Sequence, residues 1–311
     1  MTIKTAAIIG LGGIGTSVYP GLIKALGKEN VYIVAEGNRK NKFVNGINID
    51  NIIYDVNIAD SSKIPNGVDL IIFAVKGAAL DRAIEDARKY VNDNTIIMSI
   101  MNGIESEEII YEAYGHTDII YSYSLTNGTY KNGSYIISPV KEGLVLGISD
   151  KQSQRAVAKL ATLEDLIIKT EISYRISDDI MHDMWFKFLL NASGNCVAAV
   201  LGADTRYFQK LDSANMARRC IQEEIVRLSV KMGTGLTQKD IEELKDYYMV
   251  YPPEAKCSTL QDVLAGKETE NEMLCGTVVR LGEKNGVDTP ATKLLYYMLK
   301  AIDDRNKGML E

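Results

Sequence analysis

A glycine-rich segment near the start of the chain constrains the fold more than any other feature. Gly10, Gly12 and Gly15 have the spacing G-x-G-x-x-G; an apolar, strand-like run at residues 5–10 leads into them, and residues 16–27 follow with helical spacing. In this context the first glycine permits a tight turn, the second lets backbone amides approach a pyrophosphate, and the third lets the helix pack on the strand. The segment therefore predicts a dinucleotide site, and a glycine-rich turn without a ligand is the alternative.

The first half of the chain alternates short apolar runs with longer helical patterns. Strand-like runs occupy residues 5–10, 31–35, 68–75 and 95–101, and helical patterns occupy residues 16–27, 79–91 and 105–114. This alternation is typical of a parallel sheet with helices on both faces. Between residues 118 and 150, turn dipeptides such as Asn132-Gly133 predict antiparallel strands added to the sheet edge. A helix at 153–163 and a last strand at 166–170 complete this half.

The second half contains almost no strand-like runs. Helical patterns occupy residues 178–201, 213–232, 237–248, 269–285 and 292–306. Thr237 with Asp240 predicts a helix start, and Gly286 predicts a helix end. We therefore expect an α/β N-terminal domain over residues 1–172, with a parallel sheet and added antiparallel strands, and an all-α C-terminal domain over residues 173–311.

Composition narrows the class of protein. The 311 residues are 46% apolar and 24% charged, as in ordinary globular proteins. A net charge of −6 and a pI near 5.2 argue against nucleic-acid and anionic-membrane partners, which need a clustered basic surface. No apolar run approaches the length of a bilayer span, and the N-terminal segment has no cleavage-type end. We therefore expect a cytoplasmic location.

Cysteine and histidine are too few and too scattered for metal chemistry. The four cysteines lie beyond residue 190 without a C-x-x-C pair, so neither a metal site nor a disulfide framework is predicted. The two histidines are His116, which is expected to be a solvated loop residue, and His182, which is not expected to have a functional role. If the protein is an enzyme, another residue type is therefore expected to supply its proton.

The end of the second predicted strand should select the dinucleotide. Glu36 lies where an acid accepts from the ribose of NAD(H), while Arg39 and Lys40 follow closely and are suited to the 2′-phosphate of NADP(H). These signals conflict, and Glu36 as a solvated loop charge is a third reading.

One helical pattern in the second half has a polar stripe on an otherwise apolar surface. Lys187, Asn191 and Asn195 are spaced i, i+4 and i+8, so they share one helix face. Buried polar groups need partners, and a ligand cleft would provide them. The alternative is that Lys187 extends to solvent while the asparagines bond nearby backbone.

A lysine in such a cleft suits the reduction of a ketone. Hydride addition leaves an alkoxide, and an ammonium group stabilises it electrostatically and as a general acid. Glu270 is one candidate to orient the lysine, although its acidic neighbours also fit a solvated helix start.

Taken together, these residues resemble the ketopantoate reductase (2-dehydropantoate 2-reductase) family over essentially the whole chain. The matching blocks, in the family's order, are residues 10–15, 73–76, 101–103, 185–195, 258–262, 269–276 and 286–290. The resemblance implies a Rossmann domain followed by a helical domain, with the active site in the cleft between them. It also implies reduction of 2-dehydropantoate to pantoate, a step of pantothenate and coenzyme A biosynthesis, with hydride from NADPH.

The resemblance further implies roles for individual residues. Lys187 matches the catalytic lysine and Glu270 its glutamate partner. The residues matching substrate or cofactor contacts are Asn102, Asn191, Asn195 and Ser258 for the keto acid, and Gly10, Leu11, Gly12, Gly13, Ile14, Gly15, Glu36, Arg39, Lys76 and Asn102 for the dinucleotide. NADP(H) follows from the resemblance, whereas NAD(H) stays open because Glu36 replaces the family's usual arginine.

Other departures leave the substrate open. Cys275 and Thr259 stand where the family usually has asparagine and methionine. The alternatives are therefore a related dehydrogenase for another 2-keto or 3-hydroxy acid and a non-catalytic dinucleotide sensor. A small keto acid is the expected partner, and a homodimer remains an option.

Overall fold

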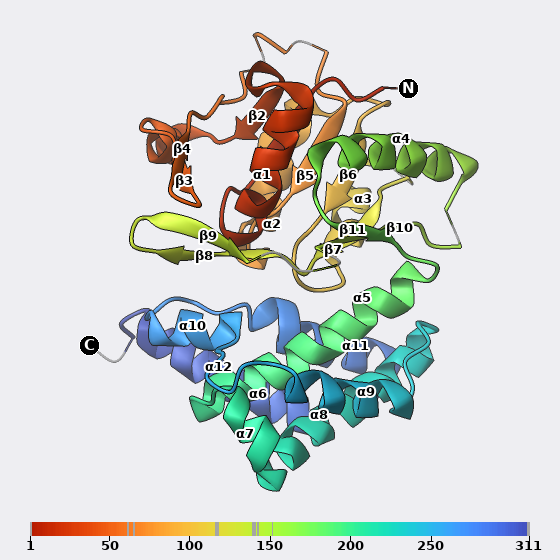
Figure 1. Ribbon diagram of the computed structural model, residues 1–311. Coiled ribbons are helices and arrows are strands. Elements are labelled where there is room, and N and C mark those ends of the chain that lie inside the picture. Colours follow the sequence, from red (N-terminus) through yellow and green to blue (C-terminus); the bar gives the residue numbers. More distant parts are fainter. Residues whose placement is uncertain are drawn as a thin grey trace. The chain divides into compact units, whose positions relative to one another are not determined.

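The computed structural model describes residues 2–60, 62–64, 66–115, 118–138, 141, 143–150 and 152–309 (Figure 1). His116 lies outside these residues. The chain divides into two compact units, Met1–Ile180 and Met181–Glu311. The first unit extends past the expected boundary at residue 172 because β11 (Tyr174–Ile176) pairs in parallel with β10 (Leu144–Gly147).

The core of the first unit is a parallel four-stranded sheet in the order β2-β1-β5-β6. Its strands are β1 (Ala6–Ile9), β2 (Val31–Val34), β5 (Leu70–Phe73) and β6 (Ile96–Ser99). Nearly every residue of these strands is buried, because helices cover both faces of the sheet. The four predicted strands and the parallel arrangement are thereby confirmed.

Two helices cover one face of this sheet. Side chains from α1 (Gly13–Leu26) and α4 (Gln154–Thr170) pack on alternate strand residues such as Ile8 and Ile72. Figure 1 shows α1 and α4 in front of the sheet and α2 (Leu80–Ala87) behind it. Helix α3 (Ser106–Tyr114) follows β6.

The strand expected at residues 166–170 was wrong. These residues form the last turns of α4, in which Leu163, Leu166, Ile167 and Thr170 are buried. Their spacing of three and four residues is helical, and a short apolar run alone does not distinguish a strand from a buried helix. The helix ends at Glu171, which has a left-handed backbone.

The antiparallel strands join the unit in two places. Strands β7 (Tyr121–Ser124), β10 and β11 form one sheet, and a bridge from Met98 to Ile120 connects it to the edge at β6.

The hairpin of β8 (Asn127–Lys131) and β9 (Ser134–Ser138) does not join that edge as expected. It pairs instead with β3 (Ile47–Ile49), which itself forms a hairpin with β4 (Ile52–Tyr54). The latter hairpin was not predicted.

Short 3₁₀ helices complete the described part of the first unit. They span Lys28–Asn30, Gly37–Phe43, Gly77–Ala79 and Arg88–Tyr90.

The second unit is helical. Its helices are α5 (Ile180–Leu189), α6 (Cys196–Leu201), α7 (Thr205–Lys210), α8 (Asp212–Met232), α9 (Gln238–Met249), α10 (Ser258–Leu264), α11 (Thr277–Asn285) and α12 (Pro290–Asn306). The capping box of Thr237 with Asp240 and the helix end at Gly286 are confirmed. The short helices α7 and α10 were not predicted.

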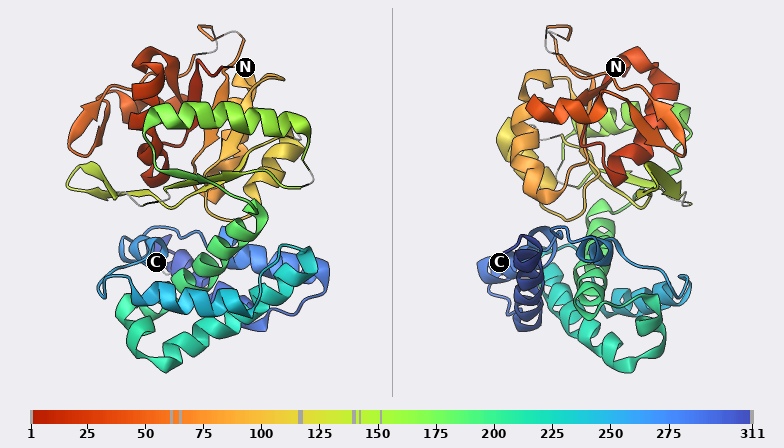
Figure 2. Two further views of the ribbon diagram at one scale, coloured as in Figure 1. Left: turned by 45° about the vertical axis from the view of Figure 1, so that its right-hand side comes forward. Right: turned by 90° about the vertical axis from the view of Figure 1, so that its left-hand side faces the viewer.

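The described part of this unit also contains two π-helical segments, one inside a continuous helix and one at the start of a helix. The first π segment, Leu190–Asn195, joins α5 to α6, and the second, Glu272–Gly276, leads into α11. The rod from α5 to α6 contacts both α8 and α12, and Figure 2 shows it between them. This rod, Ile180–Leu201, is long and apolar enough by composition to cross a membrane, but 67% of its most apolar 18-residue stretch is buried inside the protein. Such burial is typical of a core helix in a globular protein.

Candidate functional site

The glycine loop has the geometry that a dinucleotide requires. Gly10 directly follows β1 and has a φ of +95°, where a β-carbon would lie 2.6 Å from the carbonyl oxygen of Ala74. A β-carbon on Gly15 would overlap the carbonyl oxygen of Gly10, so this glycine allows α1 to approach the loop. By contrast, a β-carbon on Gly12 would meet no described atom within 4 Å. The loop therefore fits a pyrophosphate, because open space remains over the start of α1.

The contrast within the loop makes a prediction. We expect Gly12→Ala to leave the melting temperature almost unchanged, since Gly12 has a φ of −99° and open space around it. The same methyl group should weaken NADH binding about tenfold or more, because it occupies the path of the pyrophosphate. Fluorescence titration and thermal unfolding measure the two effects. Unchanged affinity would remove Gly12 from the site.

Glu36 lies just beyond β2, on the same edge of the sheet as the glycine loop. Its carboxylate accepts a hydrogen bond from Lys89 Nζ at 2.5 Å and lies 3.5 Å from Lys40 Nζ. The hydrogen bond from Lys89 is the main cause that lowers the pKa of Glu36. Arg39 pairs with the Asp86 carboxylate and donates only to the backbone carbonyl of Glu36, not to its carboxylate. Glu36 is therefore part of an ion-pair cluster with Lys89 and Lys40.

Lys76 and Asn102 also follow strands on this edge. Lys76 is exposed and comes after β5, whereas Asn102 is half-buried and comes after β6. Since β5 and β6 run parallel to β1, all three loops emerge at the carboxyl end of the sheet. Ligands of such sheets bind at this edge.

The loop that carries Asn102 rests on a buried polar cluster that the sequence did not reveal. Ser99 Oγ and Ser106 Oγ are 2.8 Å apart, and Ser106 Oγ donates to Glu107 at 2.8 Å. Burial raises the pKa of Glu107 to about 7. This cluster ties the start of α3 to the end of β6.

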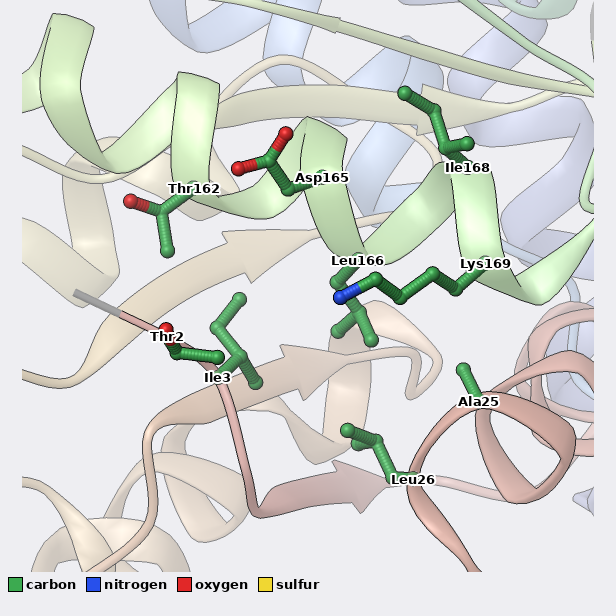
Figure 3. Close-up of a pocket in the computed structure, with 9 residues that line it drawn as sticks. All are labelled: Thr2, Ile3, Ala25, Leu26, Thr162, Asp165, Leu166, Ile168 and Lys169. Carbon is green, nitrogen blue, oxygen red and sulfur yellow. The ribbon is translucent and has the colours of Figure 1, made fainter.

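A pocket of about 440 Å³ lies elsewhere in the first unit. It is lined by Ile3 before β1, Leu26 at the end of α1 and Lys169 at the end of α4 (Figure 3). These residues lie at the amino edge of the sheet, opposite the glycine loop. The pocket is therefore separate from the predicted dinucleotide site.

The polar stripe of the helical unit is present as a hydrogen-bonded pair beside a lysine. Asn195 Nδ2 donates to Asn191 Oδ1 at 2.9 Å. Lys187 is half-buried in the last turn of α5, and its neighbours Trp185 and Phe188 are buried. The asparagines thus bond to each other rather than to backbone alone.

The first π segment keeps this stripe straight. In an α-helix, residues four apart differ by about 40° around the axis, so a stripe at i, i+4 and i+8 drifts sideways. A π-helical turn contains more residues, so four residues fall short of a full turn and the drift there runs in the opposite direction, which offsets the drift of the α-helical part. The bond from Asn195 to Asn191 shows that the two side chains remain aligned.

Glu270 differs from the acids around it. Glu268 and Glu272 are exposed, whereas Glu270 is half-buried. Its two neighbours are anchored on α12: Thr269 bonds Asp303 through both its amide and its hydroxyl, at 2.9 Å each, and Asn271 donates to the carbonyl of Tyr296. The backbone of Glu270 is therefore held in place, unlike that of a solvated helix start.

Cysteine contacts bring three elements of the helical unit together. Cys275 Sγ lies 3.8 Å from the carbonyl oxygen of Ala192, which connects the two π segments. Cys257 Sγ lies 3.5 Å from the carbonyl oxygen of Asn195, which places the start of α10, and with it Ser258, beside the stripe. The pKa of the buried Cys196 thiol is raised, mainly by its hydrogen bond with the Cys275 thiol and also by the nearby Glu270 carboxylate. Asn191, Asn195, Ser258 and Glu270 thus belong to one neighbourhood of this unit.

His182 has a structural role. Its Nε2 lies 3.0 Å from Asp240, the residue that completes the capping box of α9. Sequence reasoning missed Lys89 and Asp303, because the partner of each is distant in the chain.

These features define a class: a Rossmann-type dinucleotide-binding unit followed by a helical unit that presents a lysine and amides, as in nicotinamide-dependent oxidoreductases. Two family descriptions match the sequence, "Ketopantoate reductase PanE/ApbA" over residues 6–147 and "Ketopantoate reductase PanE/ApbA C terminal" over residues 179–303. The chain therefore belongs to the ketopantoate reductase family, as the sequence resemblance predicted.

Relatives of known name agree with this assignment. The chain is 27% identical to the 2-dehydropantoate 2-reductase of Aquifex aeolicus, over 94% of this chain and 95% of that protein. It is 24% identical to the enzyme of the same name from Pyrococcus abyssi, over 94% and 96%.

Solved structures share the fold. A D-mandelate dehydrogenase with NADH and anilino(oxo)acetate has a TM-score of 0.84 at 19% identity, covering 97% of this chain and 99% of that one. A dimeric ketopantoate reductase from Staphylococcus aureus has a TM-score of 0.79 at 20% identity, with the same coverage. Both support a Rossmann-type unit followed by a helical unit.

Proposed function

We propose that the protein reduces the keto group of 2-dehydropantoate to pantoate with NAD(P)H, a step of pantothenate and coenzyme A biosynthesis in the cytoplasm. The observation that carries the proposal is the half-buried Lys187 in line with the bonded pair of Asn191 and Asn195. The family membership and the names of the relatives support the choice of substrate.

The chain's own residues supply binding and proton transfer. When bound, the dinucleotide supplies the hydride that is added to the keto carbon. Lys187 Nζ donates a proton to the developing alkoxide, so its positive charge meets the negative charge formed in the reaction. Glu270 holds the lysine in place.

The remaining predicted residues bind the two ligands. Asn102, Asn191, Asn195 and Ser258 hold the keto acid, and Asn102 also borders the nicotinamide. The loop Gly10–Gly15, with Glu36, Arg39 and Lys76, holds the dinucleotide. A homodimer is part of the proposal, because one relative of the same fold is described as dimeric.

A dehydrogenase for another 2-keto acid is the second candidate. Cys275 is fully buried beside the first π segment, so the departure from the family's asparagine lies within the proposed substrate neighbourhood. The related fold of a D-mandelate dehydrogenase agrees with a different keto acid.

A panel of keto acids tests both candidates. NAD(P)H oxidation is followed with 2-dehydropantoate, an aliphatic branched 2-keto acid and phenylglyoxylate. We expect the highest kcat/KM with 2-dehydropantoate. A higher value with another acid supports the second candidate, and dinucleotide binding without any turnover supports a sensor.

A further inference from the structure

We propose that Lys89 determines whether the dinucleotide site accepts a 2′-phosphate, by neutralising the Glu36 carboxylate. The inference rests on the proposed function, since it concerns the ribose end of the same cofactor. Lys89 belongs to none of the motifs singled out in the sequence.

The location of Glu36 makes it the residue that faces the ribose. Val34, the last residue of β2, pairs with Ile9, the last residue of β1. Glu36 and Gly10 therefore leave neighbouring strands at the same edge of the sheet. In folds of this type, the adenosine ribose extends from the glycine loop toward the end of the second strand.

Lys89 reaches this position from a distant element. It lies in the 3₁₀ helix Arg88–Tyr90 after α2, and its Nζ donates to Glu36 Oε1 at 2.5 Å. The same Nζ lies 5.3 Å from the ring centre of Tyr90, which is buried and so fixes the base of the lysine. Lys89 is 45% exposed along its side chain, so a bound ligand can reach its ammonium group.

The other cations near Glu36 are less well placed for this role. Arg39, which the sequence suggested for the 2′-phosphate, pairs with Asp86 and donates to the backbone carbonyl of Glu36. Lys40 Nζ lies farther from the Glu36 carboxylate, at 3.5 Å. Lys89 alone of these three donates a short hydrogen bond to the Glu36 carboxylate.

The two cofactors respond differently to this pair. The ribose of NADH offers hydroxyl donors, which an ionised Glu36 accepts whether or not Lys89 is present. The 2′-phosphate of NADPH brings about two negative charges, which a bare carboxylate repels. Lys89 offsets the charge of Glu36 and offers a donor to the phosphate. Its loss should therefore weaken NADPH selectively.

Cofactor binding to the full chain tests this inference without any keto acid. The dissociation constants of NADH and NADPH are measured by nicotinamide fluorescence for the wild type, Lys89→Met and Lys89→Arg. We expect Lys89→Met to weaken NADPH about tenfold or more, the effect of one charged hydrogen bond, and NADH less than about threefold. Lys89→Arg should retain most NADPH affinity.

A control separates the local effect from a change in net charge. Lys24→Met removes the same charge at the far end of α1, where Lys24 pairs with Glu171, and should leave both constants unchanged. Equal weakening of both dinucleotides by Lys89→Met would show a merely structural contact and overturn the inference. So would a wild type that binds NADH but not NADPH. Binding of both dinucleotides without reduction of any keto acid would instead overturn the proposed function and leave the role of Lys89 standing.

Discussion

Replacing Lys187 with methionine is expected to lower kcat for keto-acid reduction by about three orders of magnitude. General acid catalysis alone contributes about 10² to 10⁴, and the lost ammonium charge adds to this figure. Methionine keeps the length and packing of the side chain, so the fold should persist. Stopped-flow measurement of NAD(P)H oxidation under single-turnover conditions gives the rate of the chemical step directly.

Two further variants give this result its meaning. Lys187→Arg keeps the positive charge but does not release a proton near neutral pH, so an intermediate rate is expected. Lys231→Met removes a lysine from the exposed end of α8 and should react like the wild type. Cofactor affinity should be the same in all three variants. If Lys187→Met turned over as fast as the wild type, the proton would have to come from another group.

Gly194→Ala is expected to lower kcat/KM by about 10²-fold, although Gly194 touches no reacting atom. A β-carbon here would overlap the hydroxyl oxygen of Tyr248 and lie 2.8 Å from the ring carbon that carries it. Either α9 or the first π segment must then move. Since Gly194 lies between Asn191 and Asn195, a shift of about 1 Å would misplace the proposed substrate contacts, and such displacements cost about 10²-fold.

Rescue by a second substitution tests this explanation. Tyr248→Phe removes the overlapping oxygen, so the double variant should recover part, but not all, of the lost kcat/KM. Gly233→Ala is the control for stability alone, because Gly233 has a φ of +71° but no described atom near its β-position. It should lower the melting temperature and leave kcat/KM unchanged. A Gly194→Ala enzyme with normal kcat/KM would show that Tyr248 can move aside without displacing Asn191 and Asn195, and would contradict this explanation.

The central fold could be predicted because its signals are local. Each strand of the parallel sheet is a continuous apolar run. The glycine loop is recognised from the spacing of its glycines, which marks the positions where a side chain would not fit. The strand predicted at residues 166–170 was wrong because an apolar run at the end of a long helix looks like a strand when taken alone. The pairing of β9 with β3 was not predicted, because it joins residues more than eighty positions apart in the chain.

The candidate site was predictable only where one element carries it. Lys187, Asn191 and Asn195 lie on one helix, so their spacing revealed them. The partner of Glu36 is Lys89, 53 positions away, and no local pattern connects them. The Asp303 anchor of Thr269 is likewise remote, and the helical periodicity of residues 178–201 does not separate a π segment from an α-helix.

The two π segments limit where residues can be inserted or deleted in this chain. A π turn accommodates one residue more than an α-helical turn, so deleting any one residue from Leu190–Asn195 would allow the rod to become a regular α-helix. Helix α6 would then keep nearly its orientation relative to α5, because the π segment already absorbs the extra residue. If the deleted residue lay between Asn191 and Asn195, the two asparagines would be three positions apart instead of four, and the geometry of their hydrogen bond would change. Substitutions in these stretches should thus be tolerated more readily than insertions or deletions.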